Sequence, residues 1–283
     1  MFDVYSSTLD VKSGDVTLNV AVHGDPEGEV ALLIHGFPDS ARLWRNQIPE
    51  LVEAGYRVVA PDLRGFGRSD RPLEPAACGM GSMVGDMVSV LQAAGAEKAH
   101  LVGHDWGAAV VWQMASRVAE MVASATVLSV GHMAAYQRAG LPQREKAWYV
   151  LLFQFEGHAE RWLSDNDWFW LRRWSDSEEV ENWISDLSRP GALSAALNVY
   201  RANMGPEYWV SPPYEPDPVQ VPVLGVWSSG DPALTERQMT GSGEFVAGDW
   251  RYERLEGVGH WIPLEAPDRL NPLLLDWLAA HRQ

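Results

Sequence analysis

The apolar residues of this chain fall into two alternating patterns. Short, nearly continuous apolar runs are typical of strands covered on both faces of a sheet, and longer stretches with helical spacing lie between them. The segments predicted as strands are 16–22, 30–34, 57–60, 99–102, 123–130, 221–227 and 251–255, and the main predicted helices are 40–53, 81–94, 108–115 and 266–280. Strands that alternate with helices predict right-handed crossovers, and therefore an α/β fold with a mostly parallel, doubly wound sheet.

The alternation stops after the predicted strand at 123–130. From 132 to about 214 the pattern is helical, and this stretch holds seven of the chain's 14 tryptophans, which are Trp148, Trp162, Trp168, Trp170, Trp174, Trp183 and Trp209. We therefore predict a helical cap inserted at 132–215, between a first core part (1–131) and a second core part (216–283). Most of these tryptophans are expected to form the cap's own core, and some to face a cleft between cap and core, where ligands tend to sit.

A short motif lies between a predicted strand and a predicted helix, at residues 103–107 (Gly-His-Asp-Trp-Gly). A nucleophile framed by small residues at such a turn is the nucleophile elbow of the α/β-hydrolase fold. Side chains at 103 or 107 would collide with neighbouring backbone. The middle position is usually serine, but here it is Asp105. Taken alone, the motif suits a helix-capping aspartate equally well.

An aspartate at this position changes the chemistry that the elbow can perform. Its carboxyl group is ionised at neutral pH without the help of a base, because its ordinary pKa is about 3.9. A carboxylate can attack an electrophilic carbon and form an ester. It is better suited to displacing a leaving group from a saturated carbon than to acyl transfer. The expected substrates are therefore epoxides or alkyl halides rather than esters or amides.

Two further residues complete a candidate triad. Asp231 follows one predicted strand and His260 follows the last, in the order nucleophile, acid, histidine that α/β-hydrolases use. The carboxyl ends of parallel strands converge on one crevice. His260 is predicted to activate the water that hydrolyses the ester, while Asp231 orients and stabilises its imidazole. The backbone N–H groups of Phe37 and Trp106 are expected to form the oxyanion hole.

Together these motifs resemble the α/β-hydrolase-fold epoxide hydrolases over nearly the whole chain. The resemblance rests on the elbow with Asp105, on residues 35–38 (His-Gly-Phe-Pro), and on Asp231 and His260. It implies conversion of an epoxide and water to a vicinal diol.

The resemblance also implies two cap tyrosines that protonate the epoxide oxygen. The matching segments carry Tyr149 and Tyr200, and Tyr136, Tyr208 and Tyr214 lie near enough to compete for the role. The residues expected to contact substrate are Phe37, Trp106, Tyr149, Tyr200 and Trp261.

Two alternatives come from other classes. Haloalkane dehalogenases share the Asp nucleophile and the following Trp, so Trp106 would bind the halide. However, those enzymes usually carry Asn or Glu where this chain has Phe37, and the fluoroacetate-type dehalogenases carry Arg where it has Trp106. A non-catalytic binder on the same fold usually shows a damaged triad, and no triad position is damaged here.

The composition of the chain limits which molecules it is expected to bind and where it is expected to act. The 283-residue chain carries a net charge of -16, which argues against nucleic acid and anionic membranes. No apolar run of about 18 residues predicts a membrane span, and the N-terminal pattern does not suggest a signal peptide. The single cysteine, Cys78, excludes an intramolecular disulfide and favours the cytoplasm. We expect no metal and no cofactor, and a small apolar epoxide as substrate. The sequence leaves open a homodimer and a role in detoxification, catabolism or biosynthesis.

Overall fold

One eight-stranded sheet forms the centre of the computed structural model, which describes residues 6–175 and 177–282. The strand order is β1-β2-β4-β3-β5-β6-β7-β8. The strands are β1 (Ser6–Ser13), β2 (Val16–His23), β3 (Val30–Ile34), β4 (Arg57–Pro61), β5 (Ala99–His104), β6 (Val122–Leu128), β7 (Val223–Ser228) and β8 (Trp250–Leu255). The pairs β1–β2 and β2–β4 are antiparallel and all the others are parallel. The predicted α/β fold with a mostly parallel sheet is confirmed.

Two elements of the fold differ from the sequence prediction, one strand and one helix. Strand β1 was not predicted, because its only apolar side chains are Leu9 and Val11. It forms by pairing with β2 across a tight turn at Gly14, with Ser13 opposite Val16. The helix expected at 40–53 is instead a 3-10 helix η1 (Ala41–Asn46) followed by α1 (Ile48–Glu53).

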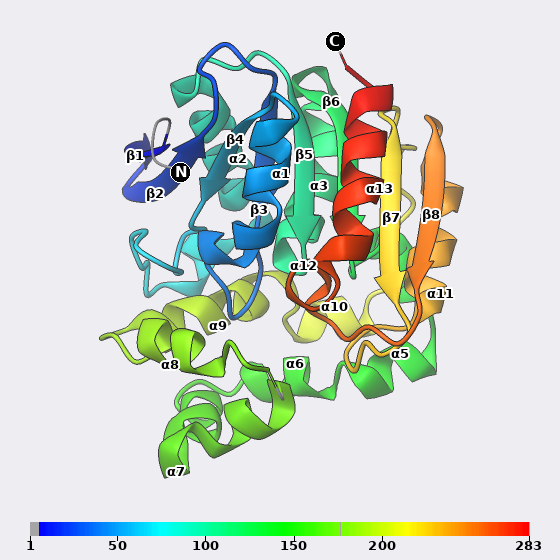
Figure 1. Cartoon of the computed structure of the whole chain (residues 1–283). Coiled ribbons are helices and arrows are strands. Elements are labelled where there is room, and N and C mark those ends of the chain that lie inside the picture. The colour runs from blue at the N-terminus through cyan, green and yellow to red at the C-terminus, as the bar shows by residue number, and fades with distance from the viewer. Residues whose placement is uncertain (1–5, 176, 283) are drawn as a thin grey trace.

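Helices cover both faces of the sheet (Figure 1). Helices α1 and α13 (Pro267–Ala280) lie on one face, and α2 (Met80–Ala93) and α3 (Trp106–Arg117) lie on the other. Adjacent residues of β3 divide between the two cores, because Leu32 packs with the α2 and α3 side and Leu33 with the α1 and α13 side. This two-sided burial explains why the central strands are apolar throughout.

In the described part of the chain, seven helices lie between β6 and β7, and we call them the inserted helices. They are α4 (Met133–Arg138), α5 (Leu141–Lys146), α6 (Trp148–Phe153), α7 (His158–Ser175), α8 (Val180–Leu187), α9 (Ala192–Asn203) and α10 (Pro206–Val210). No strand occurs among the described residues between Met133 and Val210. Figure 1 shows these helices gathered beyond one end of the sheet, where the central strand arrows point. They therefore cover the edge at which the candidate site residues were expected.

Polar contacts tie the inserted helices to the sheet domain. The Arg45 guanidinium lies 2.6 Å from the Glu179 carboxylate, and the Trp183 indole donates to Oδ1 of Asp39 over 2.8 Å. The remaining short elements are η2 (Pro75–Cys78), η3 (Ala119–Met121), α11 (Glu236–Thr240), η4 (Gly241–Phe245) and α12 (Ile262–Glu265). None of the helices in the described residues combines the length and the apolar character that a membrane crossing needs.

Candidate active site

Asp105 occupies the tight turn between β5 and α3. Its backbone angles are φ 53° and ψ -120°, in a region that residues other than glycine rarely adopt. A Cβ atom at Gly103 would overlap the carbonyl of Gly107, and one at Gly107 would overlap the carbonyl of Ile34. The predicted steric need for small residues at 103 and 107 is therefore confirmed. The turn projects the carboxylate beyond the end of β5.

One oxygen of Asp105 is held by backbone donors. The N–H of Phe37 donates to Asp105 Oδ1 over 2.8 Å, and the N–H of Trp106 also bonds the carboxylate. The turn that presents Phe37 is fixed by His35, whose Nε2 accepts from the Leu63 N–H over 2.9 Å. A Cβ at Gly36 would overlap the Asp105 carboxylate. The Phe37 N–H thus lies where an oxyanion on Oδ1 would form, and the Trp106 N–H bonds the same carboxylate.

The structure brings the three triad residues together from three different strand ends. Nδ1 of His260 lies 2.8 Å from Asp231 Oδ2, and its Nε2 lies 3.8 Å from Asp105 Oδ2. The other oxygen of Asp231 accepts the backbone N–H groups of Ala233 and Leu234 over 2.8 and 2.9 Å. All three triad side chains are buried. The imidazole is therefore oriented by Asp231 and faces the oxygen of Asp105 that the backbone donors leave free.

Charge and burial act against each other in this triad. Burial lowers the pKa of His260, but the charge and hydrogen bond of Asp231, with the charge of Asp105, outweigh it and raise the pKa to about 9. Burial raises the pKa of Asp105, whereas the charge of His260 and the two backbone N–H groups oppose this. With a pKa of about 9, His260 carries its second ring proton at neutral pH.

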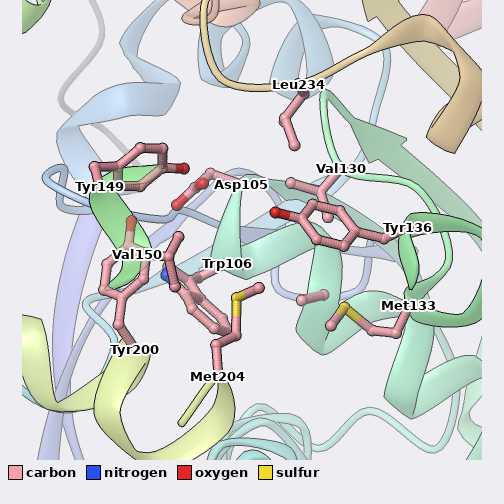
Figure 2. Close-up of a pocket in the computed structure, with 11 residues that line it drawn as sticks. Asp105, Trp106, Val130, Met133, Tyr136, Tyr149, Val150, Tyr200, Met204 and Leu234 are labelled. Carbon is pink, nitrogen blue, oxygen red and sulfur yellow. The ribbon is translucent and has the colours of Figure 1, made fainter. Parts of the chain in front are cut away.

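Tyr149 of α6 and Tyr200 of α9 border the same cavity as Asp105 (Figure 2). The space between the lining side chains is about 400 Å³, part of it open to solvent. Its other lining residues are Trp106, Ala109, Val130, Met133, Tyr136, Val150, Met204 and Leu234. Burial, followed by nearby phenols and the charge of Asp105, raises the pKa of Tyr149 well above 10. Burial and then Asp105 do the same for the pKa of Tyr200, so both hydroxyls are protonated.

Two aromatic residues next to Asp105 have different surroundings. The ring of Phe37 packs 5.6 Å from that of Tyr200, edge to face. The ring of Trp106 lies 5.0 Å from that of Tyr200, and its side chain hydrogen-bonds the Tyr200 hydroxyl. An indole N–H can only donate. Tyr200 therefore accepts from Trp106 and keeps its own proton available.

Trp261, which was expected to contact substrate, does not line the cavity that contains Asp105. Its ring lies 4.7 Å from that of Trp183, and it borders a separate cleft with His260. Some tryptophans of the inserted helices pack among themselves, as in the stacked Trp162–Trp170 pair, whereas the ring of Trp174 lies 4.9 Å from that of Tyr149. None of those seven lines the Asp105 cavity among the described residues, because α6 and α9 turn tyrosines, rather than tryptophans, toward it.

Sequence reasoning missed much of the cavity wall. Val130 and Leu234 come directly after strand-end segments, so the convergence of strand ends could have indicated them. Met133 and Met204 carry no such signal, because they reach the cavity only through the packing of α4 and the end of α9. A buried carboxyl group, Asp39, was also missed although it directly follows the 35–38 motif. Burial raises its pKa to about 7 against the hydrogen bond from Trp183.

Metal binding has no candidate in the described residues, where no group of three or more His, Cys, Asp or Glu side chains is arranged to hold an ion. The three titratable groups nearest the elbow are instead bonded to one another or to backbone N–H groups. The site offers a carboxylate, an imidazole and phenols as its reactive groups.

A carboxylate on a strand–helix elbow, with an Asp–His pair from later strand ends, defines a hydrolase of the α/β-hydrolase class. The family model described as alpha/beta hydrolase fold matches residues 30–267. Epoxide hydrolase A of Mycobacterium tuberculosis is 32% identical, over 95% of this chain and 96% of that protein. The AB hydrolase superfamily protein YfhM of Bacillus subtilis is 33% identical with the same coverage.

Solved structures agree with these similarities. The crystal structure of epoxide hydrolase A from Mycobacterium thermoresistibile superposes with a TM-score of 0.80 at 28% identity, over 98% of this chain and 99% of that one. This chain belongs to the α/β-hydrolase family, on the branch that contains these epoxide hydrolases.

Proposed function

We propose that this enzyme adds water to an epoxide and releases a vicinal diol, through an ester on Asp105. One observation carries the proposal. Oδ1 of Asp105 accepts the Phe37 N–H, whereas Oδ2 faces His260, and the side chain borders the cavity together with Tyr149 and Tyr200. The two oxygens thus have separate roles, one as nucleophile and one as the future oxyanion. The names of the similar proteins support the substrate class.

In the first half-reaction, Oδ2 of Asp105 attacks a ring carbon and the C–O bond of the epoxide breaks. An epoxide oxygen leaves as a basic alkoxide, so it needs a proton donor. Tyr149 and Tyr200 keep their protons because their pKa values are raised well above 10. Hydrogen bonds from both hydroxyls would hold the oxygen, and one phenol would give up its proton as the ring opens.

In the second half-reaction, His260 acts on water. Formation of the ester removes the negative charge of Asp105, which is one of the causes of the raised His260 pKa. The pKa of His260 therefore falls once the ester has formed, so the imidazolium passes its extra proton to the phenolate that ring opening left. The neutral imidazole can then accept a proton from water. The hydroxide attacks Cγ of Asp105, and the charge on Oδ1 is received by the N–H groups of Phe37 and Trp106. The Cγ–Oδ2 bond then breaks, and Oδ2 leaves with the diol as it takes a proton from the His260 imidazolium. The new carboxyl group of Asp105 gives its proton back to His260, which restores the starting state.

Product analysis on two substrates tests this proposal. Purified enzyme is given styrene oxide and, in parallel, a short bromoalkane, with Asp105→Asn as the inactive control. We expect diol from the epoxide and no bromide from the haloalkane. Bromide release without diol would contradict the proposal and favour a dehalogenase. Neither product from a folded enzyme would favour the non-catalytic binder.

The structure gives the dehalogenase alternative less support than the epoxide hydrolase. A departing halide needs N–H donors, and Trp106 is the expected one. Its side chain, however, hydrogen-bonds the hydroxyl of Tyr200, so a halide would have to compete for that donor. The triad is complete, which argues against a binder that has lost catalysis.

We further propose that the enzyme lies in the cytoplasm and that its role is to remove reactive epoxides. A homodimer remains an open possibility for its oligomeric state. The cysteine usage supports the compartment, because Cys78 is a single, buried thiol. Cell fractionation, and loss of growth on epoxides after deletion of the gene, would test this part.

A further inference from the structure

A third tyrosine borders the cavity, and the proposed reaction does not use it. Tyr136 of α4 is buried, with 8% of its surface exposed, and it lines the cavity with Asp105. Figure 2 shows its hydroxyl pointing into the cavity from the side across from Tyr149 and Tyr200. Ring opening needs donors only around the epoxide oxygen. A third hydroxyl on the opposite side therefore calls for a different partner.

Gln143 of α5 determines which way the Tyr136 hydroxyl can donate. The backbone N–H and the hydroxyl of Thr235 both donate to Gln143 Oε1, over 2.8 and 2.9 Å. A backbone N–H cannot accept a hydrogen bond, so the orientation of the Gln143 amide is fixed. Its NH₂ group therefore faces the other way and donates to the Ala233 carbonyl over 3.0 Å.

The Gln143 side chain also forms a hydrogen bond with the hydroxyl of Tyr136. Burial raises the pKa of Tyr136, a hydrogen bond from Gln143 lowers it, and the charge of Asp105 raises it further. The phenol oxygen thus accepts from Gln143 and the phenol is protonated at neutral pH. Among the residues that the structure describes, Gln143 is the one side chain whose hydrogen bond affects the pKa of Tyr136. Its proton remains available to a molecule in the cavity.

The rest of that side of the cavity is apolar. Val130, Met133 and Leu234 lie around Tyr136 (Figure 2). A substrate without a hydrogen-bond acceptor would exclude water from the Tyr136 hydroxyl when it fills this side of the cavity. The hydroxyl would then have no partner for its proton, which costs binding free energy. A substrate that carries an oxygen acceptor there would satisfy it, and a site built around such a bond discriminates against analogues that lack it.

We infer that Tyr136 is a specificity-determining residue, and that the preferred substrates are epoxides whose apolar substituent carries an oxygen acceptor close to the ring, as in an aryl glycidyl ether. This inference rests on the proposed function. The epoxide oxygen would lie between Tyr149 and Tyr200, and the substituent would extend toward Tyr136. The ether oxygen would then accept the Tyr136 proton, while the aryl tail would contact the apolar wall.

A matched substrate pair tests the inference. Phenyl glycidyl ether and (2-phenylethyl)oxirane differ only by an oxygen in place of a CH₂ group. We compare the ratio of their kcat/KM values in the wild type and in Tyr136→Phe. One lost hydrogen bond should lower this ratio by about five- to tenfold. Because each enzyme variant is compared on both substrates, the different intrinsic reactivities of the two epoxides cancel.

Two further variants make the test specific. A glutamate in the variant Gln143→Glu still accepts hydrogen bonds from Thr235 but no longer donates to Tyr136. The Tyr136 hydroxyl can then donate to the new carboxylate rather than to substrate. The ratio of the two kcat/KM values should therefore fall in this variant as well. Tyr208→Phe removes another phenol of the inserted helices, which is partly buried and lies outside the cavity lining. That variant should keep the wild-type ratio.

A Tyr136→Phe enzyme that keeps the wild-type ratio would overturn the inference, whether both rates are retained or both fall equally. Failure of the proposed function looks different, because the wild type would then give no diol from either epoxide.

Discussion

The backbone N–H of Phe37 donates a hydrogen bond to Oδ1 of Asp105 over 2.8 Å, across 68 positions of the sequence. This one contact distinguishes the two oxygens of a symmetric carboxylate. Oδ1 is already in the oxyanion hole before any substrate binds, so no reorganisation is needed when charge develops there. Oδ2 is left as the oxygen that attacks and later leaves with the product.

The separation of the two oxygens predicts the fate of isotope in a single turnover. With enzyme in excess over epoxide in H₂¹⁸O, the first diol should carry unlabelled oxygen from Asp105, and the label should enter the Asp105 side chain. Mass spectrometry of the peptide that contains residue 105 measures the label. Labelled diol with an unlabelled peptide would mean that water opens the ring directly.

Substitution of the base should separate the two half-reactions. His260→Gln cannot take a proton from water, so the ester should form and persist, with turnover reduced by about 10³-fold or more. Intact-protein mass spectrometry should show an increase equal to the mass of one substrate. Asp105→Asn serves as the control that gains no mass. Normal turnover in His260→Gln would contradict the two-step mechanism.

The tyrosines should act in ring opening and not in ester hydrolysis. Tyr149→Phe and Tyr200→Phe are each expected to slow formation of the ester by about 10- to 100-fold, within the usual contribution of a general acid. Stopped-flow fluorescence can follow this step, because Trp106 lines the same cavity. Tyr208→Phe is the matched control with an unchanged rate. Equal slowing of ester formation and hydrolysis would argue against specific proton donation.

The His260 ion pairs should make stability depend on pH above neutrality. Burial lowers the pKa of His260, but Asp231 and Asp105 raise it to about 9 in the folded state, against 6.5 when unfolded. The folded state therefore binds this proton more tightly. The resulting stabilisation is fully present below pH 6.5 and is lost as the pH rises through 9, at most about 3 kcal/mol. Urea unfolding at pH 6 and pH 9.5 measures it, and the dependence should be much weaker in His260→Gln.

Asp39 should destabilise the fold when it is ionised. Burial raises its pKa from the usual 3.8 to about 7, although hydrogen bonds from Trp183 and Trp261 oppose the shift. The folded state thus disfavours the charged form, so stability falls as the pH rises from about 4 through 7. Asp39→Asn can still accept from Trp183 and should be more stable than wild type at pH 8, by at most about 4 kcal/mol, but not at pH 4. Thermal unfolding at the two pH values checks the difference, and an equal effect at both would contradict this account.

Most elements of the fold could be predicted from local sequence patterns. Central strands such as β3 are apolar on both faces, so they can be recognised from sequence alone, and the glycines around Asp105 are required by backbone overlap that any chain of this fold would meet. Strand β1 could not be predicted in the same way, because its two apolar side chains form too weak a pattern. Its pairing with β2 supplies the hydrogen bonds that make it a strand.

The candidate reactive groups could be identified from the sequence, because Asp105, Asp231 and His260 each follow a recognisable strand and parallel strands end at one edge. Their surroundings depend on the packed fold. Tyr136 and Met204 lie far apart in the chain and reach one cavity through helix packing, whereas Trp261, next to His260, packs against Trp183 instead. The position of a strand end is a local property, but the direction of a side chain on a packed helix depends on every neighbour that it meets.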